Sequence, residues 1–156
     1  MKCRQSSAYR LLETLRDEFI CPMVDRIPGT LSAQCIGQQI MLDIMDAVFQ
    51  LSQALYSPKG EPRLGFIVLV QKRLEDLQTN VGALRARTKI YEKLAQEDNT
   101  KHKAARIITA KQYSTFLEKM AAIYVETEAM RKSNEEHAAK AAAAAPREGA
   151  AGTRPV

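Results

Sequence analysis

One run of hydrophobic side chains constrains the fold of this chain more than any other feature. Between residues 67 and 84, apolar residues recur at alternating steps of three and four without a break. This spacing aligns them along one side of an α-helix, in the heptad-like seam that forms where helices pack nearly antiparallel. The seam consists of Ile67, Val70, Leu74, Leu77, Val81 and Leu84. The pattern therefore predicts a bundle of packed helices.

The composition supports the same fold class. The chain has 156 residues, enough for one domain, and its 46% hydrophobic and 26% charged residues are ordinary for a globular protein. Aromatic residues make up only 6%, Trp is absent, and there are 7 Gly and 6 Pro residues. Because sheet proteins need more β-branched and aromatic residues and more turns, an all-β fold is excluded.

Four helices are predicted, near residues 34–56, 64–80, 84–104 and 109–137. Pro58 and Gly60 end the first of them, because neither residue continues a helix well. At Gly82 two interpretations are open: the second helix continues, or a tight connection lies at 80–83. The second interpretation divides the chain into helices of similar length and is preferred. The prediction is an all-α, antiparallel four-helix bundle over residues 31–137.

The segments around these helices carry further signals. Thr109 and Gln112 have the spacing of a capping box, in which each side chain bonds to the backbone N–H of the other residue. Residues 1–30, interrupted by two prolines, are predicted to be an N-terminal arm or a short helix. Residues 138–156, rich in Ala and then in Pro and Gly, are predicted to be an Ala-rich, disordered tail. The inward residues of the third helix are predicted to be Ile90, Tyr91, Leu94 and Ala95.

The sequence contains no recognisable catalytic, metal or nucleotide motif. His102 and His137 lie among charged residues, without a plausible Ser or Cys nucleophile nearby in the sequence. The Glu-x-x-His pair of metal-binding bundles is missing, because Asn occupies position 134. The glycine-rich motifs that cradle nucleotide phosphates are missing too. The chain is therefore predicted to be a non-enzyme without a metal ion or a cofactor.

Neither secretion nor membrane insertion is predicted. The first residues are interrupted by charged side chains, so they form no signal-peptide core, and no segment has the roughly 18 uncharged apolar residues that a membrane span needs. Cys3, Cys21 and Cys35 are odd in number and widely spaced, which favours reduced thiols over a disulfide framework. A soluble, cytoplasmic protein is expected.

Positive charge is concentrated in the middle of the chain. The formal net charge is +5, yet residues 57–112 alone hold twelve basic and six acidic side chains. Segregated positive charge is typical of nucleic-acid-binding proteins, because it neutralises phosphates. The alternative is a helix surface whose charges only keep it solvated. Under the first interpretation the candidate nucleic-acid-binding residues are Lys72, Arg73, Arg85, Arg87, Lys89, Lys93, Lys101, Lys103 and Arg106.

Several short motifs resemble one protein family. They are Ser-Pro-Lys-Gly at 57–60, Leu-Gly at 64–65 and Lys-Gln-Tyr at 111–113. In this order, within residues 36–132, they are similar to the accessory variability determinants of diversity-generating retroelements, which are small four-helix-bundle proteins. A related branch is encoded in intervening sequences of ribosomal RNA genes. That branch has an Asn-Ile-Ala-Glu-Gly stretch, whereas this chain has Asn-Val-Gly-Ala at 80–83, so the retroelement branch is the better match.

The resemblance implies a function and a set of partners. A protein of this family binds the reverse transcriptase of the retroelement and its template RNA, and supports mutagenic synthesis of complementary DNA without catalysing it. The resemblance also implies a basic homo-oligomer, a pentamer. From the residues alone a second function is open: a helical interaction module that docks on a protein through an apolar face and has no nucleic-acid role.

The apolar content of the second predicted helix also bears on assembly. Phe66, Ile67, Val68 and Leu69 follow one another directly, which is more hydrophobic surface than one buried stripe can use. We therefore predict a homo-oligomer in which a neighbouring subunit covers the second apolar face of this helix.

Overall fold

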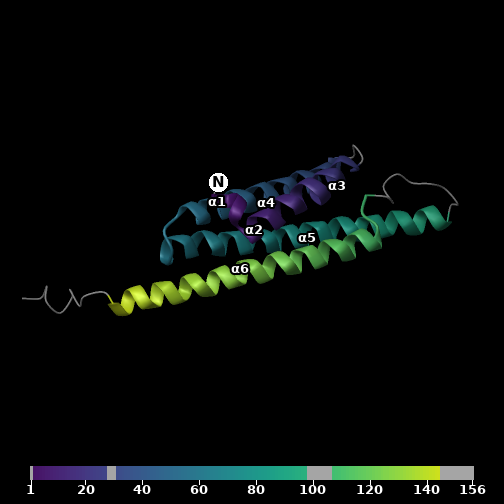
Figure 1. The fold of residues 1–156 in the computed structure, drawn as a ribbon. Helices are drawn as coiled ribbons and strands as arrows, with labels where there is room; N and C mark the ends of the chain where they lie inside the picture. The colour runs from purple at the N-terminus through teal and green to yellow at the C-terminus, as the bar shows by residue number, and fades with distance from the viewer. Residues whose placement is uncertain (1, 28–30, 98–106, 145–156) are drawn as a thin grey trace, which may run out of the picture.

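The computed structural model describes residues 2–27, 31–97 and 107–144. Within these ranges the chain is helical with short turns and contains no strand, which confirms the all-α class (Figure 1). The elements are α1 (Lys2–Gln5), α2 (Ser7–Thr14), the π-helical segment η1 (Leu15–Ile20), α3 (Cys21–Asp25), α4 (Leu31–Tyr56), α5 (Glu61–Glu97) and α6 (Ala110–Ala144).

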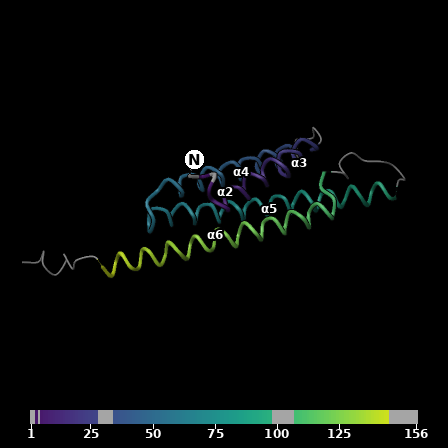
Figure 2. Tube along the Cα trace, viewed as in Figure 1, coloured from purple at the N-terminus to yellow at the C-terminus, as the bar shows by residue number. Residues whose placement is uncertain are grey.

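These elements form a bundle of four antiparallel helical segments. The α2–α3 segment, α4, α5 and α6 run alternately in opposite directions along one axis (Figures 1 and 2). α4 packs along α5, α5 packs along α6, and α2 contacts both α4 and α6. The fourth side of the bundle is therefore the N-terminal segment, and the separate helix predicted over 84–104 does not exist in the described residues.

The N-terminal segment belongs to the core of the bundle. Leu12, Ile20 and Met23 are completely buried, although the sequence predicts only an arm or a short helix here. A proline ring clashes with the carbonyl four residues earlier in a regular α-helix. The widened η1 segment, in which the Cys21 N–H bonds to the carbonyl of Arg16, precedes Pro22 and carries the helix past it.

Helix α5 is continuous through Gly82, so the predicted connection at 80–83 is wrong. The seam predicted from Ile67 to Leu84 is confirmed, since all six of its residues are at most 1% exposed. A side chain at position 82 would have its Cβ 3.3 Å from the hydroxyl of Tyr113 on α6. Gly82 therefore leaves room for the Tyr113 hydroxyl against α5.

The turn between α4 and α5 is held by side chains from α5 and α6. Gly60 has φ +101°, a conformation that favours glycine, and its N–H donates to Oδ1 of Asn134 at 3.0 Å. Arg63 donates to the carbonyl of Ser57 at 2.9 Å, so it satisfies a backbone group beyond the end of α4. The segment 57–62, with its prolines and glycine, thus forms a turn that hydrogen bonds from α5 and α6 stabilise.

Helix α6 begins with the predicted capping box. The Thr109 N–H donates to Oε1 of Gln112 at 3.0 Å, and the Gln112 N–H donates to Oγ1 of Thr109 at 3.2 Å, which confirms the prediction. Just before it, Ile107 and Ile108 are buried. The helix continues to Ala144, so residues 138–144 of the predicted Ala-rich tail are helical, and residues 145–156 lie outside the described ranges.

A polar cluster sets the register of α4 against α5. Asp43 is fully buried and accepts hydrogen bonds from Gln39 at 2.9 Å and from Asn80 at 2.7 Å. One turn further along α4, Asp46 accepts a 2.5 Å hydrogen bond from Nε of Arg73. A buried carboxylate is tolerated only when it has such partners, so the cluster favours one alignment of the two helices.

Candidate nucleic-acid interface

The structure divides the predicted nucleic-acid-binding residues into three groups. Arg73 and Arg85 form ion pairs within the protein. Lys101, Lys103 and Arg106 lie outside the described ranges. The remaining residues have exposed side chains on α5. They are Lys72, Arg87, Lys89 and Lys93.

Arg85 is a buried structural residue, which corrects its assignment to a binding surface. Its side chain is only 6% exposed, and it donates to the carbonyl of Ile108 at 2.9 Å and to Oε1 of Glu92 at 2.8 Å. A second arginine, Arg26, donates to the neighbouring carbonyl of Ile107 at 3.0 Å. Both guanidinium groups therefore anchor the chain just before α6, and Arg85 cannot reach a phosphate from this position.

Arg73 is also engaged within the protein. Its guanidinium pairs with Asp46, lies 3.5 Å from Asp76 and lies 4.0 Å from Asp43. The hydrogen bond to Asp46 raises the pKa of Arg73 further above its ordinary value. With carboxylates on several sides, this cation is a poor contact for a phosphate, since the neighbouring negative charges would repel it. We therefore remove Arg73 from the candidate interface as well.

The exposed basic residues gather at the C-terminal end of α5. We call this region the α5 tip; it consists of Arg87, Lys89, Ile90, Tyr91, Lys93 and Leu94. Lys89 and Lys93 are one helical turn apart, so they lie on the same side of α5. Lys72 is exposed too, but it is 17 positions, or about 25 Å, before Lys89 along the helix.

The apolar residues of the α5 tip face solvent, against the prediction that they point inward. Ile90 is 61% exposed, Leu94 is 40% exposed and Tyr91 is 36% exposed. The bond between Arg85 and Ile108 places the start of α6 level with Arg85, and the last buried residue of α5 is Thr88. Beyond that point α5 extends past the start of α6 (Figures 1 and 2). The tip therefore has no described helix alongside it.

One exposed basic residue near the tip was absent from the predicted set. Lys111 lies in the first turn of α6, and it is exposed. Because the start of α6 is level with Arg85, Lys111 lies near the base of the α5 tip, where the positive end of the α6 dipole also adds to the local potential. A long-range contact, between residues 85 and 108, brings this residue near α5, and the local sequence does not reveal it.

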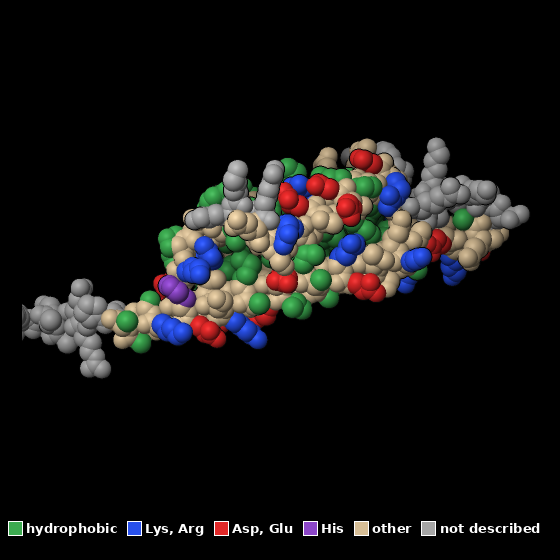
Figure 3. Space-filling model, in the orientation of Figure 1, with side chains coloured by type: hydrophobic (Ala, Val, Ile, Leu, Met, Phe, Trp, Pro, Cys, Tyr) green, Lys and Arg blue, Asp and Glu red, His purple; other side chains and the backbone are tan. Residues whose placement is uncertain are grey.

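Elsewhere on the surface, charges of both signs are mixed. On the face shown in Figure 3, Lys and Arg side chains alternate with Asp and Glu side chains along the bundle. On α6, for example, Arg131 pairs with Glu128 and lies 3.5 Å from Glu135. The hydrogen bond from Arg131 holds the pKa of Glu128 below its ordinary value. Such pairs are typical of a solvated helix surface.

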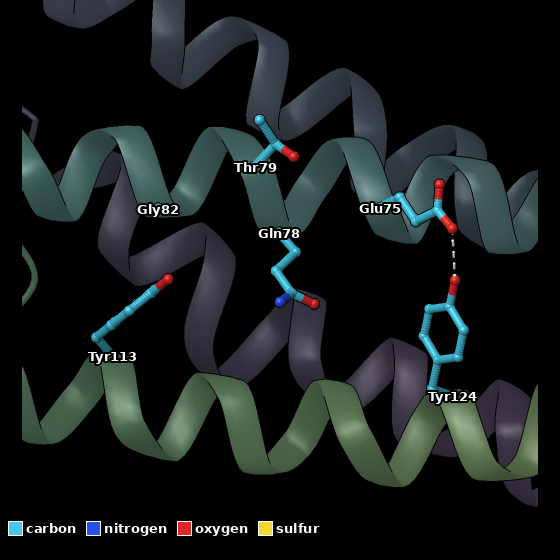
Figure 4. A pocket seen from close by; sticks show the side chains of 6 residues that line it. All are labelled: Glu75, Gln78, Thr79, Gly82, Tyr113 and Tyr124. Carbon is cyan, nitrogen blue, oxygen red and sulfur yellow. Dashed lines mark hydrogen bonds between the residues drawn. The ribbon is translucent and has the colours of Figure 1, made fainter.

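A polar groove lies between α5 and α6. It has a volume of about 430 Å³ and is lined by Glu75, Gln78, Thr79, Gly82, Tyr113 and Tyr124 (Figure 4). The Tyr124 hydroxyl donates to Oε1 of Glu75 at 2.9 Å. Burial, and then the hydrogen bond to Glu75, raise the pKa of Tyr124. Its lining contains no Lys, Arg or His, so the groove offers no cation for a phosphate.

Within residues 2–27, 31–97 and 107–144, no three His, Cys, Asp or Glu side chains are placed to hold a metal ion. No helix in these ranges is both long enough and apolar enough to cross a membrane.

Comparison with known proteins adds no relative. Neither protein-family models, nor curated proteins, nor solved structures give a significant match to this chain.

Proposed function

We propose that this protein is a non-catalytic accessory protein of a diversity-generating retroelement. In this role it binds template RNA through the α5 tip, binds the reverse transcriptase as a protein partner, and acts as a homo-oligomer. One structural observation supports the RNA-binding part: three exposed basic side chains lie beside exposed apolar and aromatic groups at the tip. The retroelement itself, and the reverse transcriptase, rest on the motif resemblance within residues 36–132.

The α5 tip has the chemistry that single-stranded RNA requires. Arg87, Lys89 and Lys93 supply positive charge for phosphates, which dominates the affinity of sequence-independent binding. The ring of Tyr91 can stack on a base, and Ile90 and Leu94 offer apolar contacts next to it. Because the contacts are to phosphates and base faces, we expect little preference for sequence.

The binding experiment compares two double variants that remove the same charge. In Lys89→Ala/Lys93→Ala, single-stranded RNA of mixed sequence should bind more weakly, and the slope of log affinity against log salt should fall by about 0.7 for each lost contact. The control is Lys132→Ala/Lys140→Ala, which removes two exposed lysines from α6. It should retain nearly the affinity of the wild type in the same filter-binding titration.

Two results would overturn this assignment. If both double variants lose affinity equally, binding follows net charge and the α5 tip has no special role. If the wild type does not bind RNA even at low salt, the nucleic-acid function is wrong.

The retroelement assignment has a separate test. A reverse transcriptase gene and a repeated template region should lie beside the gene for this protein, and the two proteins should co-purify when they are expressed together. Absence of a reverse transcriptase gene from the neighbourhood would contradict this part of the proposal, whatever the RNA titration shows.

A specific observation also favours the second candidate function, a module that docks on proteins. Leu42, Met45, Phe49 and Tyr56 form an exposed apolar stripe on α4, and each is more than half exposed. Apolar docking is insensitive to salt, whereas phosphate contacts weaken steeply as salt rises. Salt dependence of complex formation therefore separates the two functions.

A further inference from the structure

Helix α4 carries a second seam, whose large apolar side chains the bundle leaves exposed. Leu42 is 61% exposed, Met45 57%, Phe49 56% and Tyr56 61%. With Gln38 and Ser52 they follow steps of four, three, four, three and four, which is the heptad spacing of a helix that packs on another helix. We call this set the α4 outer seam; it consists of Gln38, Leu42, Met45, Phe49, Ser52 and Tyr56.

The large apolar residues of the α4 outer seam are not needed for the fold of a single chain, whereas Ser52 lies at the edge of the seam, with its Oγ 3.8 Å from Sγ of Cys3 in α1. The core side of α4 is formed by other residues, among them Ile40, Ile44 and Leu51, which are completely buried. Four large apolar side chains within about 21 Å of one helix form a contiguous patch, and such patches on a globular protein mark interaction sites. The spacing indicates a helix as the occupant.

The charges around the α4 outer seam indicate which helix packs on it. α4 contains no Lys and no Arg, although the whole chain has a formal net charge of +5. The two acidic residues of α4 are matched, since Asp43 is buried among its hydrogen-bond donors and Asp46 pairs with Arg73. A nucleic acid gains nothing from such a face. Two copies of a basic protein, in contrast, can meet here without mutual repulsion.

We propose that the α4 outer seam binds the α4 outer seam of a second copy of this chain, with the two helices antiparallel. In an antiparallel pair centred on residue 47, three kinds of layer form. Met45 meets Phe49 of the second copy, Leu42 meets Ser52, and Gln38 meets Tyr56. Each layer joins a larger side chain to a smaller or more flexible one, so the space above Ser52 is filled and the Tyr56 hydroxyl reaches an amide.

The antiparallel direction also follows from the alternatives. A parallel pair would place Tyr56 against Tyr56, two large rings in one layer, and Ser52 against Ser52, two small side chains that leave a void in the next layer. It would also align the two helix dipoles, whereas an antiparallel pair opposes them.

This inference specifies a two-fold contact between copies, which closes a dimer and is not the contact of the pentamer that the family resemblance implies, and it does not depend on nucleic acid. It also differs from the contact predicted from sequence, which is the apolar run at 66–69 on α5. In that run Ile67 is buried, while Val68 is 51% exposed and Leu69 is 45% exposed. The α4 outer seam is longer and more exposed, and its periodicity is that of a helix pair.

Sedimentation of the purified full chain, without nucleic acid, tests the contact. The wild type should have at least twice the mass of one 17.4 kDa chain at micromolar concentration. Phe49→Glu should sediment as a monomer, because it places a charge in the central layer. The control is Val125→Glu on α6, a residue that is 69% exposed and lies outside the seam, and it should keep the wild-type mass.

The outcomes against the proposal are distinct from a failure of the proposed function. A monomeric wild type would overturn the contact between copies. A Phe49→Glu variant with the wild-type mass would show that copies meet elsewhere. RNA binding by a monomeric wild type would leave the nucleic-acid role intact while overturning this contact.

Cysteine cross-linking tests the direction and does not require a disrupted variant. The wild type contains Cys35, which is exposed and lies one heptad before Leu42. In the antiparallel pair the two Cys35 residues are roughly 36 Å apart along the axis, so oxidation should not cross-link them. In a Cys35→Ser background, Gln38→Cys/Tyr56→Cys should give a covalent dimer on oxidation, and each single cysteine variant should not. A Cys35 dimer in the wild type, or no dimer from the double variant, would overturn the antiparallel pair.

Discussion

The backbone N–H of Gly60 donates a 3.0 Å hydrogen bond to the Asn134 side chain, across 74 positions of the chain. Asn134 is 5% exposed, and its amide group donates to the carbonyl of Met130 at 2.8 Å. One buried side chain thus satisfies the α4–α5 turn and its own helix at once. This residue also occupies the position at which a Glu would make a Glu-x-x-His pair with His137, so its place in the fold gives a structural reason for that missing motif.

Replacing this residue should loosen the turn. Asn134→Ala leaves the Gly60 N–H without its partner in a buried position, and we expect a loss of about 1–3 kcal/mol of the free energy of unfolding. The neighbouring exposed residue provides the control, since Ser133→Ala should change stability little. Urea unfolding of the two variants measures the difference, and equal stabilities would mean that water serves the Gly60 N–H equally well.

The capping box offers a second test. Thr109→Ala removes the acceptor for the Gln112 N–H, and we expect it to cost about 0.5–2 kcal/mol. Thr109→Ser keeps the hydroxyl and should retain most of the stability. Thermal unfolding followed by circular dichroism compares the two variants. A serine variant as unstable as the alanine variant would place the origin of the loss in the methyl group.

The seam on α5 should contribute the largest single losses. Leu77 is completely buried, and Leu77→Ala removes apolar contacts and leaves a cavity, so we expect a cost of about 2–5 kcal/mol. The matched control is Leu69→Ala on the same helix, where the side chain is 45% exposed. In denaturant titrations of the single chain its cost should be clearly smaller. Comparable losses would contradict the packing of α5.

The sequence predicts what is local or periodic in this fold. The spacing from Ile67 to Leu84 is a property of a single helix, and the capping box involves only Thr109 and Gln112, so both can be predicted without knowing the tertiary structure. The break expected at Gly82 fails because a helical glycine costs only about 1 kcal/mol, which the approach of Tyr113 and the buried seam on both sides readily outweigh.

The candidate interface is harder to predict, because burial of a charge depends on distant partners. Arg85 follows the seam residue Leu84, and in the sequence it cannot be distinguished from an exposed basic residue beside an apolar stripe. The carbonyl that it binds belongs to Ile108, which is 23 positions away. Ile90 and Leu94 are one helical turn apart, and in a separate third helix they are predicted to face inward. Because α5 is continuous, its seam continues from Leu84 at positions 88, 91 and 95 instead, so Ile90 and Leu94 lie off the seam and are exposed.

The α5–α6 groove predicts a dependence on alkaline pH. Burial and the bond to Glu75 raise the pKa of Tyr124 above its ordinary value of 10.0, so the neutral hydroxyl is favoured in the folded state. This contribution to stability is complete below pH 10, and it is lost as the pH rises through the pKa of the folded state. Tyr124→Phe should therefore be less stable than wild type at pH 8, by no more than about 1 kcal/mol, and the difference should shrink at higher pH.

The measurement is urea unfolding of both proteins at a series of pH values from neutral upward. Tyr9, whose pKa is also raised, first by burial and then by Glu13, is present in both proteins, so its effect cancels in the comparison. A difference that stays constant across the series would mean that the hydroxyl of Tyr124 does not titrate differently in the folded and unfolded states.

Two arginines separated by one residue should give opposite results. Arg85→Ala leaves a buried carbonyl at Ile108 and the carboxylate of Glu92 without their donor, so we expect it to destabilise the protein by about 1.5–3 kcal/mol. Arg87→Ala changes an exposed residue of the α5 tip, and stability should change by less than about 1 kcal/mol, because charge contacts at an exposed position contribute little. In RNA titrations the order should reverse: Arg87→Ala should weaken binding and lower the salt slope, whereas folded Arg85→Ala should bind like wild type. Both measurements are made on each variant below the temperature at which Arg85→Ala unfolds. If Arg85→Ala, while folded, lost as much RNA affinity as Arg87→Ala, the separation of structural from binding arginines would be wrong.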